Sequence, residues 1–98
     1  MTDDSDPIEY FLEDMAYHGR SERTRDAYER VLRDFESDLD GTKPLDSVTH
    51  RDCLAWIADL RSTAAESTVA SYAAYLHRFY AYMNDVGVFE ENPMKLVM

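Results

Sequence analysis

Apolar residues recur along this chain every three or four positions, the spacing that lines one face of an α-helix. In the first such segment they are Ile8, Phe11, Leu12 and Met15. Asp6 before Pro7 is typical of a helix start, because a carboxylate caps the first turn and proline suits the first helical position. Gly19 follows His18 as a stop signal. The pattern predicts a first helix between these two signals.

A second helix is predicted from Ser21, a good N-cap residue, to Asp40-Gly41. One arc of its helical wheel holds the residues Thr24, Tyr28, Val31, Leu32, Phe35 and Leu39. Arg23 and Arg30 fall close together on the other side of the wheel, with Arg33 nearby. Lys43-Pro44 belongs to a linker.

Thr49 and Asp52 form a short capping box that predicts the start of a third helix. The buried face expected for it consists of Cys53, Leu54, Trp56, Ile57 and Leu60. A loop over residues 62–66 leads to the longest helix, expected from about Ser67 to Val86. Its apolar stripe is Val69, Tyr72, Ala73, Leu76, Phe79, Tyr80 and Met83, flanked by Tyr75 and Tyr82 as the candidates for surface contacts. Gly87 caps this helix, Asn92-Pro93 marks an exit, and a short apolar tail follows.

Four helices in 98 residues indicate a single all-α domain. Glycine and proline are scarce, at three residues each, which suits short helix connections better than the many turns of a β-sandwich. In this bundle we expect one core that buries Tyr28, Phe35, Trp56, Leu76 and Phe79 together.

The charge is strongly acidic, with 20 acids against 10 bases and a formal net charge of −10. Nucleic-acid binders usually have the opposite balance. Eight of the bases are Arg, and the only Lys residues are Lys43 and Lys95. Acidic surfaces with little lysine are typical of proteins from extreme halophiles; the alternative is an acidic mesophilic domain. The one basic stretch is residues 20–33, with five Arg against three acids.

No catalytic or metal-binding pattern is present in the sequence. His18, His50 and His77 lie in separate predicted elements and lack the spacing of metal ligands, so no metal and no cofactor are expected. Cys53 falls on an apolar face and is predicted to be a buried structural thiol. No segment is long and apolar enough for a membrane span, and the acidic N-terminus is no signal peptide. We expect a soluble, cytoplasmic protein that is not an enzyme by itself.

Two surfaces are candidates for contacts with a partner. Ser67, Ala70, Ser71, Ala74 and Arg78 share one face of the fourth helix, where small residues suit either close approach to DNA or packing on another helix. At the start of the second helix, Arg20, Ser21, Arg23 and Arg25 form a candidate phosphate cradle. Taken alone, the pattern slightly favours the alternative, in which these arginines pair with Glu22, Asp26 and Glu29 on a solvated helix.

Several spaced residues together resemble the N-terminal core-binding domain of tyrosine recombinases, the phage integrase family. They are Gly19, then Ser21, Thr24, Tyr28, Leu32 and Phe35, then Thr49 and Asp52, and finally Phe79-Tyr80 before Asn92-Pro93. The resemblance covers residues 8–96 and implies a SAM-like four- to five-helix domain whose second and fourth helices enter the major groove. It also implies that a separate C-terminal catalytic domain, expected to be absent from these 98 residues, carries the nucleophilic tyrosine.

By position, the resemblance assigns DNA contacts to Ser21, Arg23, Thr24 and Arg25, and to Ser67, Ser71, Ala74 and Arg78. His77-Arg78 stands where the family usually has a basic pair, and Ser71 where it often has an arginine. Arg20 and Arg30 complete the candidate set from the basic stretch. We expect Arg23, Arg25 and Arg78 on one surface, and the partners to be a double-stranded recombination site, the catalytic domain and other recombinase protomers. The alternative is a helical protein-protein interaction module with no nucleic-acid role.

Overall fold

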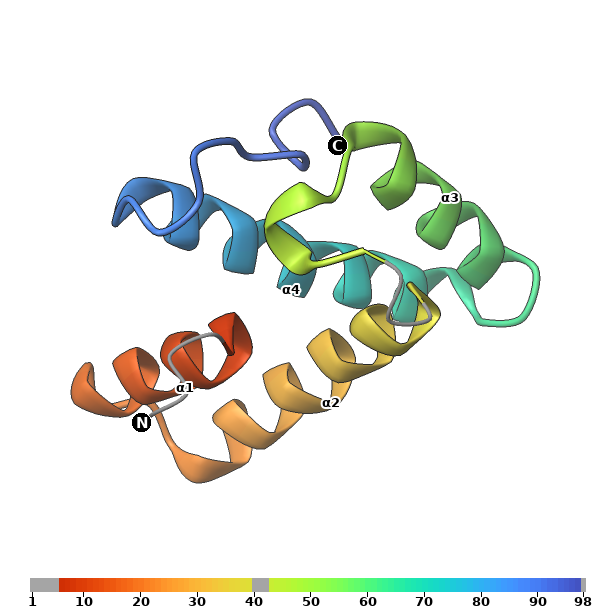
Figure 1. Ribbon diagram of the computed structural model, residues 1–98. Coiled ribbons are helices and arrows are strands. Elements are labelled where there is room, and N and C mark those ends of the chain that lie inside the picture. The colour runs from red at the N-terminus through yellow and green to blue at the C-terminus, as the bar shows by residue number, and fades with distance from the viewer. Residues whose placement is uncertain (1–5, 40–42, 98) are drawn as a thin grey trace.

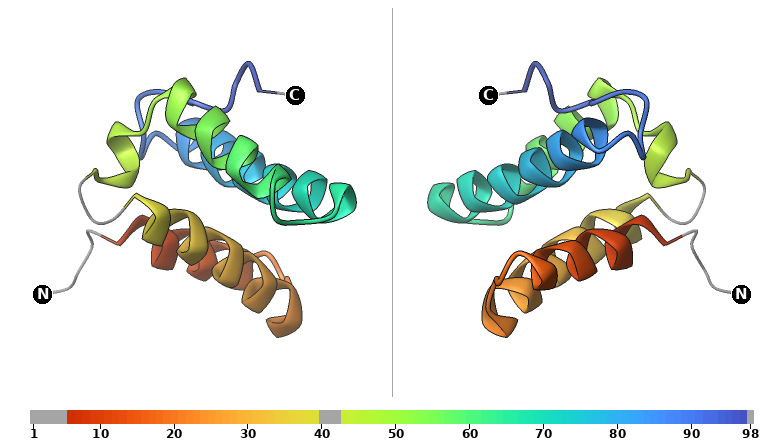
Figure 2. Two further views of the ribbon diagram at one scale, coloured as in Figure 1. Left: turned by 90° about the vertical axis from the view of Figure 1, so that its right-hand side faces the viewer. Right: turned by 90° about the vertical axis from the view of Figure 1, so that its left-hand side faces the viewer.

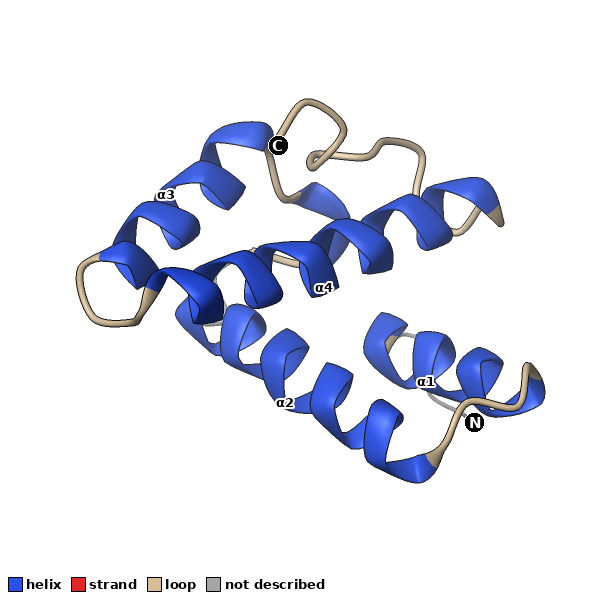
Figure 3. Ribbon diagram, turned by 180° about the vertical axis from the view of Figure 1, so that it is seen from behind, coloured by secondary structure: helices blue, strands red, loops and turns tan. Residues whose placement is uncertain are grey.

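The computed structural model describes residues 6–39 and 43–97, and all regular structure in these residues is helical. The helices are α1 (Pro7–Tyr17), α2 (Glu22–Asp38), α3 (His50–Arg61) and α4 (Glu66–Asp85), with a short 3-10 helix, η1 (Leu45–Ser47), before α3. This confirms the all-α prediction and the order of the four helices (Figures 1 and 3). The predicted stop of the second helix at Asp40-Gly41 lies outside the described residues.

The helices form two layers, α1 with α2 and α3 with α4, joined at one end by the segment that contains η1 (Figure 2). α2 packs across α4, and the core lies between the layers. The five residues expected in one core, Tyr28, Phe35, Trp56, Leu76 and Phe79, are all buried in it. Aromatic edges meet aromatic faces there, as between Phe35 and Trp56, whose ring centroids are 5.0 Å apart.

The predicted caps of the first two helices are present. The Asp6 carboxylate accepts hydrogen bonds from the backbone N–H groups of Ile8 and Glu9 and so satisfies donors that the first turn leaves unpaired. Gly19 has a φ of 82°, in the left-handed region that glycine adopts without strain, and it turns the chain from α1 into α2. This tight turn places the start of α2 beside the end of α1.

Two predictions for the second half of the chain were wrong in detail. Leu54, expected on the buried face of α3, is 45% exposed, because that face is centred on Cys53, Trp56 and Ile57. Glu66, expected in the loop, is the first residue of α4, and the N-cap is Ala65 rather than a hydroxyl residue. Helix α4 therefore spans Glu66–Asp85, one residue earlier at each end than its pattern predicted.

The segment after α4 runs back over α4 toward the start of α3 (Figures 1 and 3). Phe89, Met94 and Val97 are buried in the core, so the apolar tail is part of the fold. The carbonyl of Pro93 accepts a hydrogen bond from Nδ1 of His50 at 3.3 Å, and the buried hydroxyl of Tyr80 donates to the carbonyl of Leu45 at 2.8 Å. These bonds attach the irregular segments to the helical layers.

Cys53 is buried and free, as expected of a structural thiol. Burial raises its pKa to about 12, with a smaller effect from Asp52, so the thiol stays protonated at neutral pH. Within residues 6–39 and 43–97, no helix combines the length and the apolar character needed to cross a bilayer.

Candidate nucleic-acid interface

One face of α4 is uncovered along its length. The α4 residues assigned to the small-residue face or to DNA contacts are all exposed, namely Ser67, Ala70, Ser71, Ala74, His77 and Arg78, whereas Tyr75 and Tyr82 are partly buried. Because the side chains on this face are small, another surface can approach the backbone of α4 closely. Asp85, exposed and seven residues beyond Arg78, is the acidic residue at the C-terminal end of the same face.

The hydroxyl of Ser21 caps α2 and also bonds the hydroxyl of Thr24. The Ser21 hydroxyl accepts from the backbone N–H of Thr24 at 3.1 Å and donates to the Thr24 hydroxyl at 3.0 Å. The proton of Ser21 is therefore used inside the protein, whereas the proton of the Thr24 hydroxyl remains available. Of the two predicted contacts, Thr24 is the better donor to an external acceptor.

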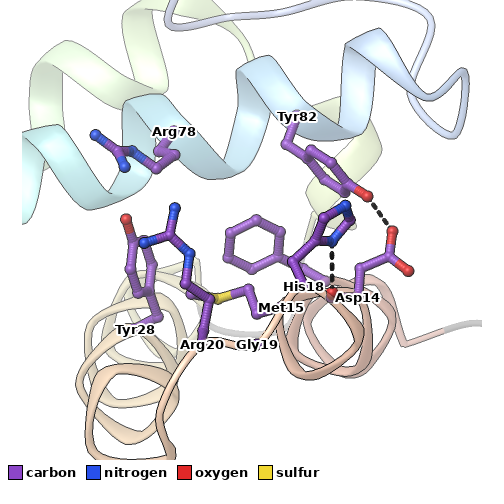
Figure 4. Close-up of a pocket in the computed structure, with 9 residues that line it drawn as sticks. Asp14, Met15, His18, Gly19, Arg20, Tyr28, Arg78 and Tyr82 are labelled. Carbon is purple, nitrogen blue, oxygen red and sulfur yellow. Dashed lines mark hydrogen bonds between the residues drawn. The ribbon is translucent and has the colours of Figure 1, made fainter.

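The turn between α1 and α2 brings arginines toward α4. Nε of Arg25 donates to the carbonyl of Arg20 at 3.4 Å, which folds Arg25 back over the turn. Arg78 lies above the hydroxyl of Tyr28 and the guanidinium of Arg20 lies beside it, and all three side chains line one cavity of about 520 Å³ (Figure 4). Burial raises the pKa of Tyr28, while the positive charges of Arg78 and Arg20 act in the opposite direction.

The opposite wall of this cavity is formed by Asp14, His18 and Tyr82 (Figure 4). The Tyr82 hydroxyl donates a hydrogen bond to the Asp14 carboxylate, and this bond raises the pKa of Tyr82 to about 12. Nδ1 of His18 donates to the Asp14 carbonyl at 2.9 Å, because a carbonyl oxygen only accepts. The second ring nitrogen of His18, Nε2, is not used in that bond.

Ion pairs elsewhere in the molecule occupy other bases. Arg33 lies among four carboxylates, those of Asp6, Glu9, Glu29 and Glu36, at 3.0 to 3.7 Å. Partial burial acts to lower its pKa, but the hydrogen bonds to Asp6 and Glu36 outweigh this and raise it. Lys43 pairs with Asp52 at 2.7 Å. Neither Arg20 nor Arg78 has a carboxylate within ion-pair distance in the described part of the chain.

The predicted set of DNA contacts is divided by the fold. Arg20, Arg25 and Arg78 lie at or beside the turn and its cavity. Arg23 and Arg30 are exposed, and the 100° step of an α-helix puts them on the side of α2 opposite Tyr28. The structure therefore does not bring Arg23 to the cavity that Arg78 lines.

No sequence pattern pointed to His18, Tyr28 and Tyr82 as walls of this cavity. Tyr28 is buried in the core as predicted, and its side chain also lines the cavity. Tyr82, predicted as a surface contact, is partly buried: its ring packs against the core and its hydroxyl bonds Asp14 on the cavity wall. The packing partners of these rings are distant in sequence, as between Phe11 and Tyr82, 5.7 Å apart. No local spacing signals such a pairing.

Among the described residues, no group of histidine, cysteine and acidic side chains is arranged to hold a metal ion. The Asp14 carboxylate lies on the far wall, and the side chains that converge on the other side of the cavity are hydrogen-bond donors, Arg20, Tyr28 and Arg78, two of them cationic. Their chemistry suits an anion.

The fold and this surface define a small all-α domain with an exposed helix face next to a basic turn. Over residues 8–87 the chain matches the family model of the phage integrase N-terminal SAM-like domain. The match spans most of the chain, so the chain belongs to this family, whose N-terminal domain is a non-catalytic part of integrases. Comparisons with curated proteins and with solved structures gave no significant match.

Proposed function

We propose that this domain binds duplex DNA as the N-terminal part of a site-specific tyrosine recombinase and positions a catalytic domain on the recombination site. The observation that carries the proposal is the continuity of two surfaces: the exposed face of α4 and the turn that holds Arg20 share Arg78. The family match supports a role in recombination. The partners are then the duplex, the catalytic domain and other protomers on the same DNA, in the cytoplasm.

The acidity of the chain limits the affinity of the isolated domain for DNA. With a net charge of −10, the domain alone has weak affinity for a polyanion, and the catalytic domain supplies the rest of the grip. We interpret the excess of acids and of Arg over Lys as adaptation to concentrated salt, as in haloarchaeal proteins. None of the seven tyrosines is proposed as a nucleophile.

A direct test is fluorescence anisotropy of the 98-residue chain with a labelled duplex over a range of KCl concentrations. Arg78→Ala should weaken binding and reduce the salt slope by about 0.9, the contribution of one phosphate contact. Arg61→Ala, an exposed arginine in the last turn of α3, is the matched control for loss of one positive charge. Equal effects of the two variants would leave only non-specific charge, and the proposed interface would be wrong.

A second function is favoured by one specific observation. A groove of about 520 Å³ runs along α4 between Ala70, Ala74 and Ala81 and the tail residues Met94 and Val97. Its lining is mostly apolar, as expected of a surface that receives a helix from another protein. Binding of a partner protein in this groove, with an affinity that added DNA does not change, would support the interaction-module alternative.

A further inference from the structure

The cavity between α1, α2 and α4 has the features of an anion site. Arg20 reaches it from the α1–α2 turn and Arg78 from the middle of α4, so the two guanidinium groups come from different layers of the fold (Figure 4). The Tyr28 hydroxyl lies below Arg78 and beside the guanidinium of Arg20, and no hydrogen bond to a described residue occupies it. Three groups able to donate therefore face one volume.

The charges around the cavity favour a ligand from outside the chain. Like the other arginines apart from Arg33, Arg20 and Arg78 pair with no carboxylate in residues 6–39 and 43–97. They differ from the other unpaired arginines in that both line the same cavity. The carboxylate that lines the same cavity, Asp14, already accepts the hydroxyl proton of Tyr82. That bond holds Asp14 on the far wall and leaves the guanidinium groups open to another anion.

We propose that this cavity binds one phosphate group, held between Arg20 and Arg78, with the Tyr28 hydroxyl as a further donor. A tetrahedral phosphate has enough oxygens to accept from both guanidinium groups at once, and charge-assisted bonds of this kind are the strong ones. The source of the phosphate is the duplex backbone if the proposed function holds, and the inference rests on that function for its source. Free phosphate has the same chemistry and is the other source.

Such a site has a consequence for how the domain sits on DNA. A single phosphate bound by both arginines bridges the turn before α2 and the exposed face of α4, which carries Ser71 and Ala74. Phosphate contacts set the register of a protein on the duplex, while base contacts read the sequence. The bound phosphate fixes where along the groove the α4 face lies.

The first arm of the test uses inorganic phosphate. The arginine Nε–Hε signals of the 98-residue chain are followed by NMR during titration with potassium phosphate at constant ionic strength. The signals of Arg20 and Arg78 should shift together with one binding curve, while that of Arg61 stays in place. Arg20→Ala and Arg78→Ala should each abolish the curve, with thermal melts confirming that both variants fold. A shift of Arg61 equal to the others overturns the site.

The second arm uses duplex DNA and a double-mutant cycle. If both arginines hold one phosphate, each single variant lowers the salt slope by about 0.9 and the double variant lowers it no further. Two separate phosphates would lower it by about 1.8 in the double variant and overturn the shared site. If the chain binds the duplex but the two variants reduce the salt slope additively, the shared site is wrong and the proposed function stands. If the chain binds inorganic phosphate but no duplex, the proposed function is wrong and free phosphate is the source.

Discussion

The hydroxyl of Tyr82 on α4 donates a hydrogen bond to the carboxylate of Asp14 on α1, which ties the two layers together at the edge of the cavity. The bond also keeps an acidic side chain engaged on the wall opposite Arg20. A single contact between residues far apart in the sequence thus serves both the packing of the layers and the charge of the candidate site.

Tyr82→Phe should therefore destabilise the domain. A hydrogen bond to a charged group contributes about 1.5–3 kcal/mol in general, and partial exposure of this pair to water reduces the expected loss to about 1 kcal/mol. Urea unfolding at pH 7 measures it. An Asp14→Asn variant removes the charge and keeps an acceptor, so it should lose less than Tyr82→Phe; a larger loss would contradict this account.

The same bond makes a prediction for alkaline pH. The pKa of Tyr82 is raised from 10.0 to about 12 in the folded protein, so its contribution to stability is complete below about pH 10 and disappears as the pH rises through 12. Cys53, raised to about 12 mainly by burial, acts in the same direction. Melting temperatures between pH 8 and 12 should fall in the wild type and fall less in Tyr82→Phe. Parallel profiles would exclude Tyr82 as a contributor.

Truncation of buried core residues should cost much more stability than truncation of exposed residues on the same helix. Phe35 is 0% exposed and contacts Trp56, so Phe35→Ala should cost about 3–5 kcal/mol through lost burial and a residual cavity. Two leucine-sized residues on α3 supply the internal comparison: Ile57 is 4% exposed and Leu54 is 45% exposed. Ile57→Ala should cost about 2–4 kcal/mol and Leu54→Ala under about 0.5 kcal/mol, as measured by chemical denaturation.

The contrast between Leu54 and Ile57 shows how far the sequence determines the fold. Helix periodicity located all four helices. Caps marked the starts of the first three, because Asp6, Ser21 and Thr49 make local bonds that a short stretch of sequence specifies. Which residues at the margin of a stripe are covered depends on the neighbouring helix. Leu54 lies on that margin and remains 45% exposed.

Part of the candidate site was predictable from the sequence, but the wall residues His18, Tyr28 and Tyr82 and the geometry of the cavity were not. The exposed face of α4 followed from periodicity, since it is the side away from the apolar stripe. The meeting of Arg20 and Arg78 at the Tyr28 hydroxyl depends on how α2 crosses α4, which is set by long-range ring contacts such as that of Tyr28 with Tyr75, 4.4 Å apart. Local spacing carries no information about that crossing.

Salt dependence tests the interpretation of the acidic surface. At low ionic strength the 20 acids repel one another across a small domain, and the Debye length shrinks from about 10 Å at 0.1 M to about 3 Å at 1 M. The melting temperature should rise steadily with KCl over this range. The ion pairs of Arg33 are weakened by the same salt, so a flat or falling curve would mean that local attraction outweighs global repulsion and would count against halophilic adaptation.

The last prediction adds a contact instead of removing one. Ser71 is exposed on the α4 face, two helical turns before Arg78 and only about 20° from it around the helix axis, at the position where the family often has an arginine. Ser71→Arg should create an additional phosphate contact. Because one contact changes log K by about 0.9 per decade of salt, duplex affinity at 0.1 M KCl should rise roughly 8-fold and the salt slope should steepen by about 0.9.

The control for Ser71→Arg is Ala58→Arg, which adds the same charge at an exposed position of α3, outside the proposed interface. Making the net charge less negative should raise the affinity for the duplex only slightly in both variants. A contact with a DNA phosphate should raise the affinity further in Ser71→Arg alone. Anisotropy titrations at several KCl concentrations separate the two effects, since only a true phosphate contact steepens the slope. Equal gains in the two variants would show that the α4 face does not meet the duplex.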